Sequence, residues 1–149
     1  MEREEWSPRT VVAATDGSER SIQAARVATA LARRNQATLY IVTVVRPPEG
    51  WWGIGGSPPP PDVLGDALME AQRSVLQQTV DAVDLAGLDW QTVEELGDPA
   101  ARLVAFCEEN QADVLVVGRR GASIVERMVM GSVADRVAHE SPCPVLVVP

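Results

Sequence analysis

Five short runs of apolar and β-branched residues alternate along this chain with segments in which apolar residues recur every three or four positions. The runs cover residues 10–15, 38–45, 90–95, 114–117 and 145–148. Such runs are typical of buried strands, and a period near 3.6 is typical of amphipathic helices. Strands that alternate with helices favour a parallel sheet covered by helices on both faces. Residues 1–149 are therefore predicted to form one α/β domain, a size that suits a single core.

Local signals place the four helices between these strands. The first helix follows Asp16-Gly17-Ser18, and the last covers about 132–140. In the second helix, Asp62 is the predicted N-cap, and Gly87 is predicted to terminate it. Asp98-Pro99 begins the third helix. The predicted apolar stripe of the second helix consists of Val63, Leu64, Ala67, Leu68, Ala71, Val75 and Val83.

Two segments lie outside this alternation. Residues 1–9 form a charged leader, and residues 46–61 are rich in Pro, Gly and Trp. Pro58 to Pro61 lack N–H donors and are predicted to be extended as polyproline II. Trp51 and Trp52 either pack against an apolar edge, cover a ligand or hold a partner. The second segment is interpreted as a loop insertion.

Composition narrows the possible functions. All thirteen basic residues are arginine, which excludes a Walker A loop and lysine Schiff-base chemistry. The net charge of −8 argues against a nucleic-acid partner. Without an apolar leader or a long apolar run we expect no membrane segment and a cytoplasmic location. Cys107 and Cys143 show neither redox nor metal-site spacing and are interpreted as buried or incidental thiols.

The connection after the fourth predicted strand is unusually long. It contains Gly118, Gly121 and the pair Gly131-Ser132, where the last helix begins, together with Arg119, Arg120 and Arg127. Glycines permit a close backbone approach, and a helix N-terminus favours an anion. Such a loop at the carboxyl end of a strand indicates a phosphate site. The alternative is a surface loop in which Ser132 is an ordinary N-cap.

Asp16 stands in the corresponding position after the first strand. It is either a turn carboxylate that starts the helix or, if it lies opposite the glycine loop across a parallel sheet, a ligand for a sugar hydroxyl or a metal ion.

Several motifs occur in an order that resembles the universal stress protein family. They are TDGS (15–18), ALARR (30–34), VGRRG (117–121), MGSVADRV (130–137) and the terminal SPCPVLVVP (141–149). The spacing G-x2-G-x9-G-S from Gly118 to Ser132 is similar to that of the ATP-binding branch of the family. The resemblance implies a Rossmann-like sheet, of the adenine nucleotide alpha hydrolase-like type, with strand order 3-2-1-4-5, and a homodimer.

The resemblance also implies ATP, with Mg²⁺, at the ends of the first and fourth strands. Asp16 would face the ribose or the metal, main-chain groups near Val44 would hold adenine, and the glycine loop would hold the phosphates. Many relatives carry Ser-His where this chain has Arg119-Arg120, so the side-chain contacts to phosphate differ. The implied nucleotide-binding residues are Ala14, Thr15, Asp16, Val44, Gly118, Arg119, Arg120, Gly121, Gly131, Ser132 and Val133.

These observations favour a nucleotide-responsive stress protein with at most slow ATP hydrolysis. A hydrolase would need a placed base, and the single histidine, His139, lies late in the last helix, so no catalytic residue is assigned. The alternatives are a weak ATPase and a nucleotide-free interaction module of the same fold. The apolar run Val145–Val148 has no helix after it and is expected to pair with a second copy, unless Pro149 or the leader shields it.

Overall fold

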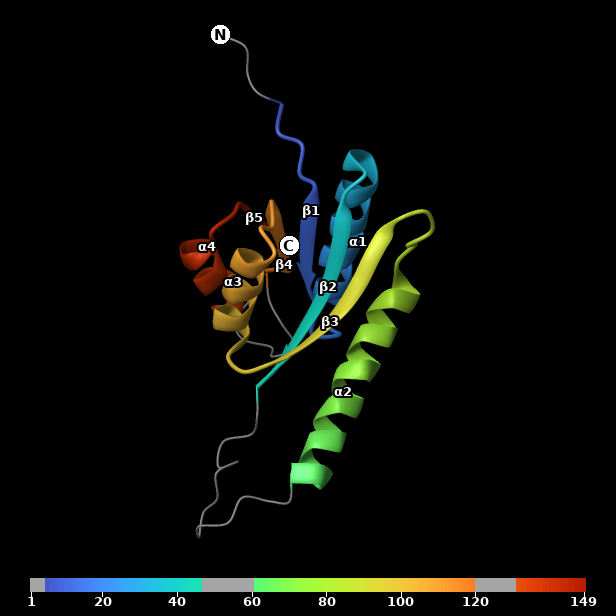
Figure 1. Cartoon of the computed structure of the whole chain (residues 1–149), viewed down its shortest axis with the longest axis vertical. Coiled ribbons are helices and arrows are strands. Elements are labelled where there is room, and N and C mark those ends of the chain that lie inside the picture. The colour runs from blue at the N-terminus through green and yellow to red at the C-terminus, as the bar shows by residue number, and fades with distance from the viewer. Residues whose placement is uncertain (1–4, 47–60, 120–130) are drawn as a thin grey trace.

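A computed structural model of the chain describes residues 5–46, 61–119 and 131–149, with the side chains of 61–64 also outside the description. The elements alternate regularly between strand and helix (Figure 1). They are, in chain order, β1 (Thr10–Ala14), α1 (Glu19–Asn35), β2 (Thr38–Val45), α2 (Pro61–Ala82), β3 (Asp89–Leu96), α3 (Pro99–Glu109), β4 (Val114–Gly118), α4 (Ser132–Glu140) and β5 (Val145–Val148).

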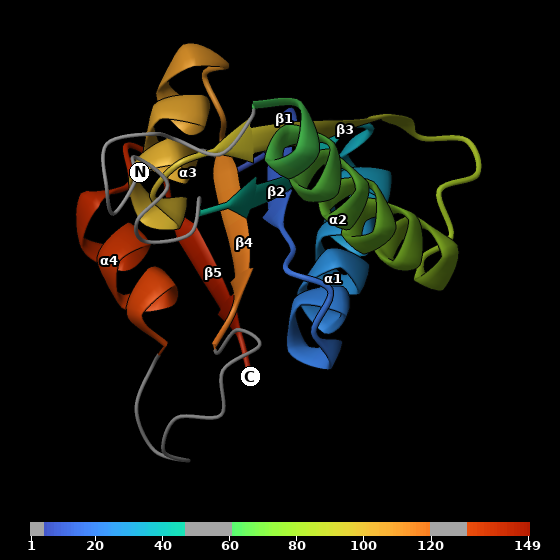
Figure 2. The same ribbon diagram turned by 90° about the horizontal axis from the view of Figure 1, so that it is seen from below.

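All five strands are parallel, in the order β3-β2-β1-β4-β5. Helices α1 and α2 lie on one side of the sheet, and α3 and α4 lie on the other (Figure 2). The three-layer α/β fold and the strand order expected from the sequence are therefore confirmed. The weakly patterned third strand is an edge strand, as predicted, and Asp89–Trp90 at its start is exposed.

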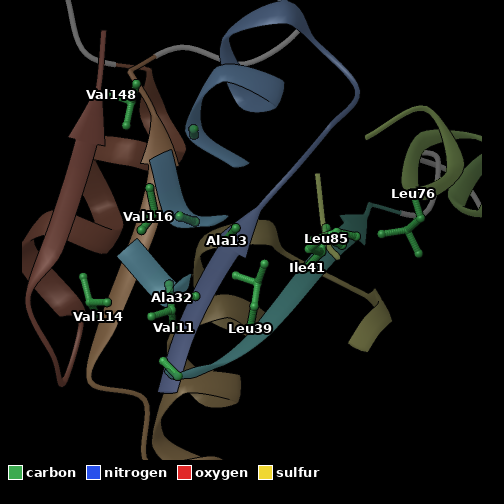
Figure 3. Close-up of a cluster of buried hydrophobic side chains, with 13 residues drawn as sticks. Val11, Ala13, Ala32, Leu39, Ile41, Leu76, Leu85, Val114, Val116 and Val148 are labelled. Atoms are coloured by element: carbon green, nitrogen blue, oxygen red, sulfur yellow. The ribbon is translucent and has the colours of Figure 1, made fainter. Parts of the chain in front are cut away.

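Two hydrophobic clusters fill the space between the sheet and its helices. The first lies under α1 and α2 and includes Val11, Leu39, Ile41 and Val116, all of them buried (Figure 3). The second lies under α3 and α4 and is built on Val12, Leu115, Leu103, Phe106 and Val137. Neighbouring residues of β1 and β4 thus enter opposite clusters, because side chains alternate across a strand. Because both faces of the central strands are buried, their sequences are continuous apolar runs.

Helix α1 packs closely on the centre of the sheet because its buried stripe is made of small residues. Ala24, Ala28 and Ala32 recur every four positions, and all three are fully buried in the first cluster. Ser18 caps the helix by accepting a hydrogen bond from Ser21 N at 3.3 Å. Arg33, in the last turn of α1, donates to the carbonyl oxygens of Asp84 and Ala86 beyond α2.

Helix α2 differs from the sequence prediction at both of its ends. It begins at Pro61, so Pro61 is helical rather than polyproline II, and Asp62 lies inside the first turn rather than at the N-cap. Proline suits this position because the first N–H of a helix has no intrahelical acceptor. The helix ends at Ala82, so Gly87 does not follow it directly. Gly87 instead takes φ +76° in a separate turn before β3, closed by a hydrogen bond from Leu88 N to Leu85 O.

The buried face of α2 also differs from the predicted stripe. Ala67 and Ala71 are exposed, whereas Gln72, Leu76 and Thr79 are buried. The two polar members are tolerated because each is hydrogen-bonded, Gln72 Nε2 to Glu95 O at 2.7 Å and Thr79 within a hydroxyl cluster described below. Apolar periodicity could not reveal a helix face that is partly polar.

Asp98 connects three elements at the carboxyl edge of the sheet. It caps α3, as predicted, by accepting from Ala101 N at 3.0 Å. Its carboxylate also accepts from Arg46, which follows β2, and from Arg136 on α4 at 2.6 Å. The hydrogen bond from Ala101 N lowers the pKa of Asp98 below its ordinary value, despite partial desolvation, and so do the hydrogen bond from Arg136 and the positive charges of Arg136 and Arg46.

This arrangement predicts a pH-dependent contribution of Asp98 to stability. The Asp98→Asn variant retains an N-cap oxygen but loses the charge. Because the pKa is lowered in the folded state, the carboxylate stabilises the fold above the ordinary pKa of 3.8 and less as pH falls further. Urea unfolding should show wild type more stable than the variant at pH 7, with the difference shrinking below about pH 4. The matched control is Asp66→Asn, at an exposed position on α2; equal pH dependence of both variants would contradict the assignment.

Candidate functional site

The candidate site lies where the order of the strands reverses. β1 and β4 are neighbours in the sheet, with Ala13 paired to Val116, but α1 leaves the end of β1 on one face and α4 packs on the other. In open α/β sheets, ligands bind beyond the carboxyl ends of the strands at this switch point. The same edge lies towards the bottom of Figure 1, where β1 and β2 end.

A buried hydroxyl cluster fixes the turn after β1. Thr15 Oγ1 lies 2.8 Å from Thr79 Oγ1 on α2 and 3.1 Å from Ser21 Oγ on α1. The main chain of Thr15 continues the ladder by donating to Val42 O at 2.9 Å. A buried hydroxyl that lost these partners would cost about 1–3 kcal/mol. The Thr15 side chain is therefore part of the scaffold that holds the turn in place.

Asp16 is exposed at the tip of this turn. Its Oδ1 accepts from Ser18 N at 2.9 Å, and its N–H donates to Ser21 Oγ at 3.2 Å. Gly17 has φ +82° and faces Val75 and Gln78 of α2, which suits a residue without a side chain. The interpretation of Asp16 as a turn carboxylate is thus confirmed, and its role towards a ligand stays a prediction.

The glycine loop leaves and re-enters the fold at one point. Gly118 pairs with Val148 at the end of β4, and Arg119 N donates to Val148 O at 2.7 Å. Gly131 N then donates to Arg119 O at 2.7 Å, so the two ends of the connection are hydrogen-bonded to each other. Arg120, Gly121 and Arg127 fall in 120–130, outside the described residues. The start of α4 is consequently held beside the end of β4.

The N-terminus of α4 has no side-chain cap. Gly131 is its N-cap, and Ser132 is the first helical residue, so the alternative of Ser132 as an ordinary N-cap is wrong. The first N–H groups of any helix lack intrahelical acceptors. In α1 and α3, side-chain oxygens of Ser18 and Asp98 accept from such groups. At α4 the N-cap glycine offers no side chain, and no side-chain cap hydrogen bond is formed within the described part of the chain.

The remaining predicted site residues lie at the same edge. Ala14 ends β1, and Val44 lies two residues beyond Val42, the last β2 residue paired with β1. Val44 and Val133 are both partly buried against the second cluster. The structure therefore brings together Ala14, Thr15, Asp16, Val44, Gly118, Arg119, Gly131, Ser132 and Val133 along the ends of β2, β1 and β4.

Sequence analysis did not find the ion pairs beside this site. Asp98 was recognised as an N-cap, but its pairing with Arg46 and Arg136 joins residues far apart in the chain and has no local signal. Thr79 was also missed, because a single threonine in a helix gives no indication of a buried hydroxyl partner.

His139 lies on the surface, as predicted: its side chain is 78% exposed, with Nε2 3.6 Å from Asp135 Oδ1. Within the described ranges, no group of three or more His, Cys, Asp or Glu residues is placed to hold a metal ion. In the same ranges, no helix is both long and apolar enough to cross a membrane.

Comparison with known proteins identifies the family. The model of the universal stress protein family matches residues 8–149. A universal stress protein of Methanocaldococcus jannaschii is 33% identical over 147 residues, covering 94% of this chain and 81% of that protein. The structure of a universal stress protein from Lactobacillus plantarum has a TM-score of 0.75 at 20% identity, covering 97% of this chain and 100% of its own.

A second solved structure, a universal stress protein in complex with cAMP, has a TM-score of 0.66 at 29% identity, and the match covers 97% of this chain and 98% of that one. The family model spans nearly the whole chain, and the Methanocaldococcus relative is similar along the same length. The chain therefore belongs to the universal stress protein family.

Proposed function

We propose that this protein binds ATP at the switch point between β1 and β4 and acts as a nucleotide-responsive regulatory protein. The observation that carries the proposal is the start of α4, where the N-cap, Gly131, supplies no side-chain acceptor to the first N–H groups of the helix. A helix N-terminus of this kind combines oriented donors with the positive end of the helix dipole, which together favour a phosphate group.

The charges around this helix end support an anionic ligand. The chain carries a net charge of −8, so anion binding needs a local source of positive potential. Arg119 lies where the two ends of the loop meet. Its N–H donates to Val148 O, and its carbonyl oxygen accepts from Gly131 N. The predicted contribution of Arg120, in the undescribed part of the loop, would add to this potential.

The adenine nucleotide class is supported by the related protein solved with cAMP. In this chain, Asp16 is exposed after β1 and is the carboxylate that would meet a ribose hydroxyl or Mg²⁺. Magnesium in nucleotide sites is held by one or two carboxylates together with phosphate oxygens, which fits a single aspartate here. Main-chain groups at Val44, where β2 extends beyond β1, would receive the adenine.

Slow hydrolysis at most follows from the same geometry. His139 lies seven residues after Ser132, about 10 Å along α4, and is exposed beside Asp135. It is therefore poorly placed to activate a water molecule at the phosphates. Nucleotide binding, rather than turnover, is the activity that we assign to this site.

Titration calorimetry tests the binding itself. We expect saturable heat with ATP and Mg²⁺, and much weaker binding of adenosine, because the donors of α4 act on phosphate. Absence of saturation with ATP at millimolar concentration would contradict the proposal and would favour the nucleotide-free interaction module.

Gly131→Asp tests the helix end directly. Gly131 has φ −57° and ψ 150°, which aspartate adopts easily, and its carboxylate would accept from the N–H groups that we assign to phosphate. The variant should therefore unfold at the same or a higher urea concentration while its ATP affinity falls at least about tenfold, or 1.4 kcal/mol. A variant that binds ATP like wild type would show that the phosphates lie elsewhere.

Two further variants compare how much individual loop residues contribute to ATP affinity. Ser132→Ala should remove one hydrogen bond, costing about 0.5–1.5 kcal/mol of binding energy or somewhat more to a charged oxygen. Gly121→Val should abolish binding and leave the fold intact, because a branched side chain would obstruct the phosphate path or forbid the required φ. If both bound ATP with unchanged affinity in calorimetry, the loop would be purely structural.

We further propose that the protein is a homodimer joined through β5. β5 is an edge strand in the sheet, bonded to β4. Val145 and Val147 pack on the second cluster and Val148 on the first, whereas Leu146 is 40% exposed. An apolar edge strand invites pairing with a second copy, and a two-fold axis lets the same strand serve both chains.

Leu146→Lys tests this proposed dimer interface. Its side chain is the exposed one in β5, so a charge there should weaken the dimer without disturbing either cluster; Val147→Lys would also perturb the core. Sedimentation at micromolar concentration should give about twice 16.0 kDa for wild type and a lower average mass for the variant. A wild-type monomer, or a dimer unaffected by the change, would contradict the proposed interface.

A further inference from the structure

The two cysteines of the chain are brought together by the fold. Cys107 lies on α3 and is 1% exposed, and Cys143 lies between α4 and β5 and is half-buried. Both contribute to the second hydrophobic cluster, and Cys143 is near enough to Cys107 to help raise the pKa of its thiol, after burial. Cys107 is a buried free thiol, as the sequence predicted, and Cys143 is a free thiol beside the same cluster.

We propose that Cys107 and Cys143 form a reversible intrachain disulfide when the reduced protein meets hydrogen peroxide. This thiol pair is thus a redox modification site, separate from the nucleotide site at the start of α4.

A small turn holds Cys143 in position. Ser141 Oγ donates to Cys143 O at 2.8 Å and accepts from Cys143 N at 3.2 Å. The same hydroxyl lies 3.4 Å from Cys143 Sγ. Prolines at 142 and 144 restrict the backbone on both sides of the cysteine. Cys143 is consequently held beside the second cluster by a short, constrained segment, which lowers the entropy lost when the bond forms.

The surroundings of the two sulfur atoms set the order of events. Burial, and then the neighbouring Cys143, raise the pKa of the Cys107 thiol to about 12, so Cys107 is protonated at neutral pH. Because thiolates are the nucleophiles and Cys143 is the more accessible thiol, Cys143 meets the oxidant first.

Hydrogen peroxide would convert the two thiols into a disulfide in two steps. The Cys143 thiolate attacks one oxygen of hydrogen peroxide, the O–O bond breaks, and hydroxide takes up the proton lost by the thiol, leaving a sulfenic acid. The Cys107 sulfur then attacks the sulfenic sulfur, the S–O bond breaks, and the hydroxyl leaves as water with the Cys107 proton. Two thiols thereby lose two electrons and two protons, and one peroxide becomes two water molecules.

The bond would tie α3 to the connection between α4 and β5. The closed loop contains β4 and α4, the elements that border the glycine loop. A cross-link of this kind restricts the unfolded chain, so the oxidised protein should unfold at a higher temperature than the reduced one.

Peptide mapping of the full chain tests the proposal. Reduced protein is treated with hydrogen peroxide, free thiols are alkylated under denaturing conditions, and the chain is cleaved after arginine without reduction. The two cysteines then fall in separate peptides, 103–119 and 137–149. We expect these two peptides to be joined, with the link absent after dithiothreitol. A sulfinic Cys143 beside an alkylated Cys107, a bond between two chains, or two unmodified thiols would each overturn the proposal.

Single substitutions provide matched controls for the order of attack. In Cys107→Ser the remaining Cys143 should be oxidised further or take up an added thiol, whereas in Cys143→Ser the buried Cys107 should react much more slowly than the wild-type pair. Circular dichroism confirms the fold of both variants, and Cys143, being half-buried, tolerates the change more readily. Oxidation of Cys107 in Cys143→Ser at the wild-type rate would contradict the assigned roles and overturn the proposal.

Discussion

The parallel pairing of β1 with β4 is the constraint on which the rest of this structure depends. Their register joins Val11 to Val114 and Ala13 to Val116, and both strands are buried on both faces. Because the flanking helices leave in opposite directions, the two carboxyl ends are not covered by a direct crossover. The turn at Asp16 and the end of β4 at Gly118 thereby lie at the same edge of the sheet, although they are far apart in the chain.

The helix N-termini at this edge of the sheet differ in which groups accept from their first N–H donors. This difference distinguishes the helix ends with a structural role from the end that we propose binds phosphate. Ser18 and Asp98 cap α1 and α3, and Asp98 also pairs with arginines from two other elements. At those two helix ends, side chains of the protein accept from the first N–H groups. The α4 end is joined to the end of β4 by the hydrogen bond from Gly131 N to Arg119 O, but its N-cap offers no side-chain oxygen. The proposed phosphate site rests on this helix N-terminus, because backbone N–H groups and the helix dipole favour an anion there.

Features of the chain that act locally could be predicted from the sequence. The strands, the Asp98 cap and the glycine spacing depend on neighbouring residues or on a regular period, and the resemblance to the family supplied the strand order. The face of α2 was misjudged because Gln72 and Thr79 are buried through hydrogen bonds to distant residues. The contact of Cys107 with Cys143 was missed for a related reason, since it forms only when α3 and the α4–β5 connection share one cluster.

The central claim, that the start of α4 receives nucleotide phosphate, is tested most directly by backbone amide NMR during titration. The amide resonances of Gly131, Ser132 and Val133 are followed with ATP and Mg²⁺ and, separately, with adenosine. We expect large shifts at these three amides with ATP and small ones with adenosine, while the amides at the capped start of α3 stay unchanged. Equal shifts with both ligands, or shifts confined to other parts of the chain, would contradict it.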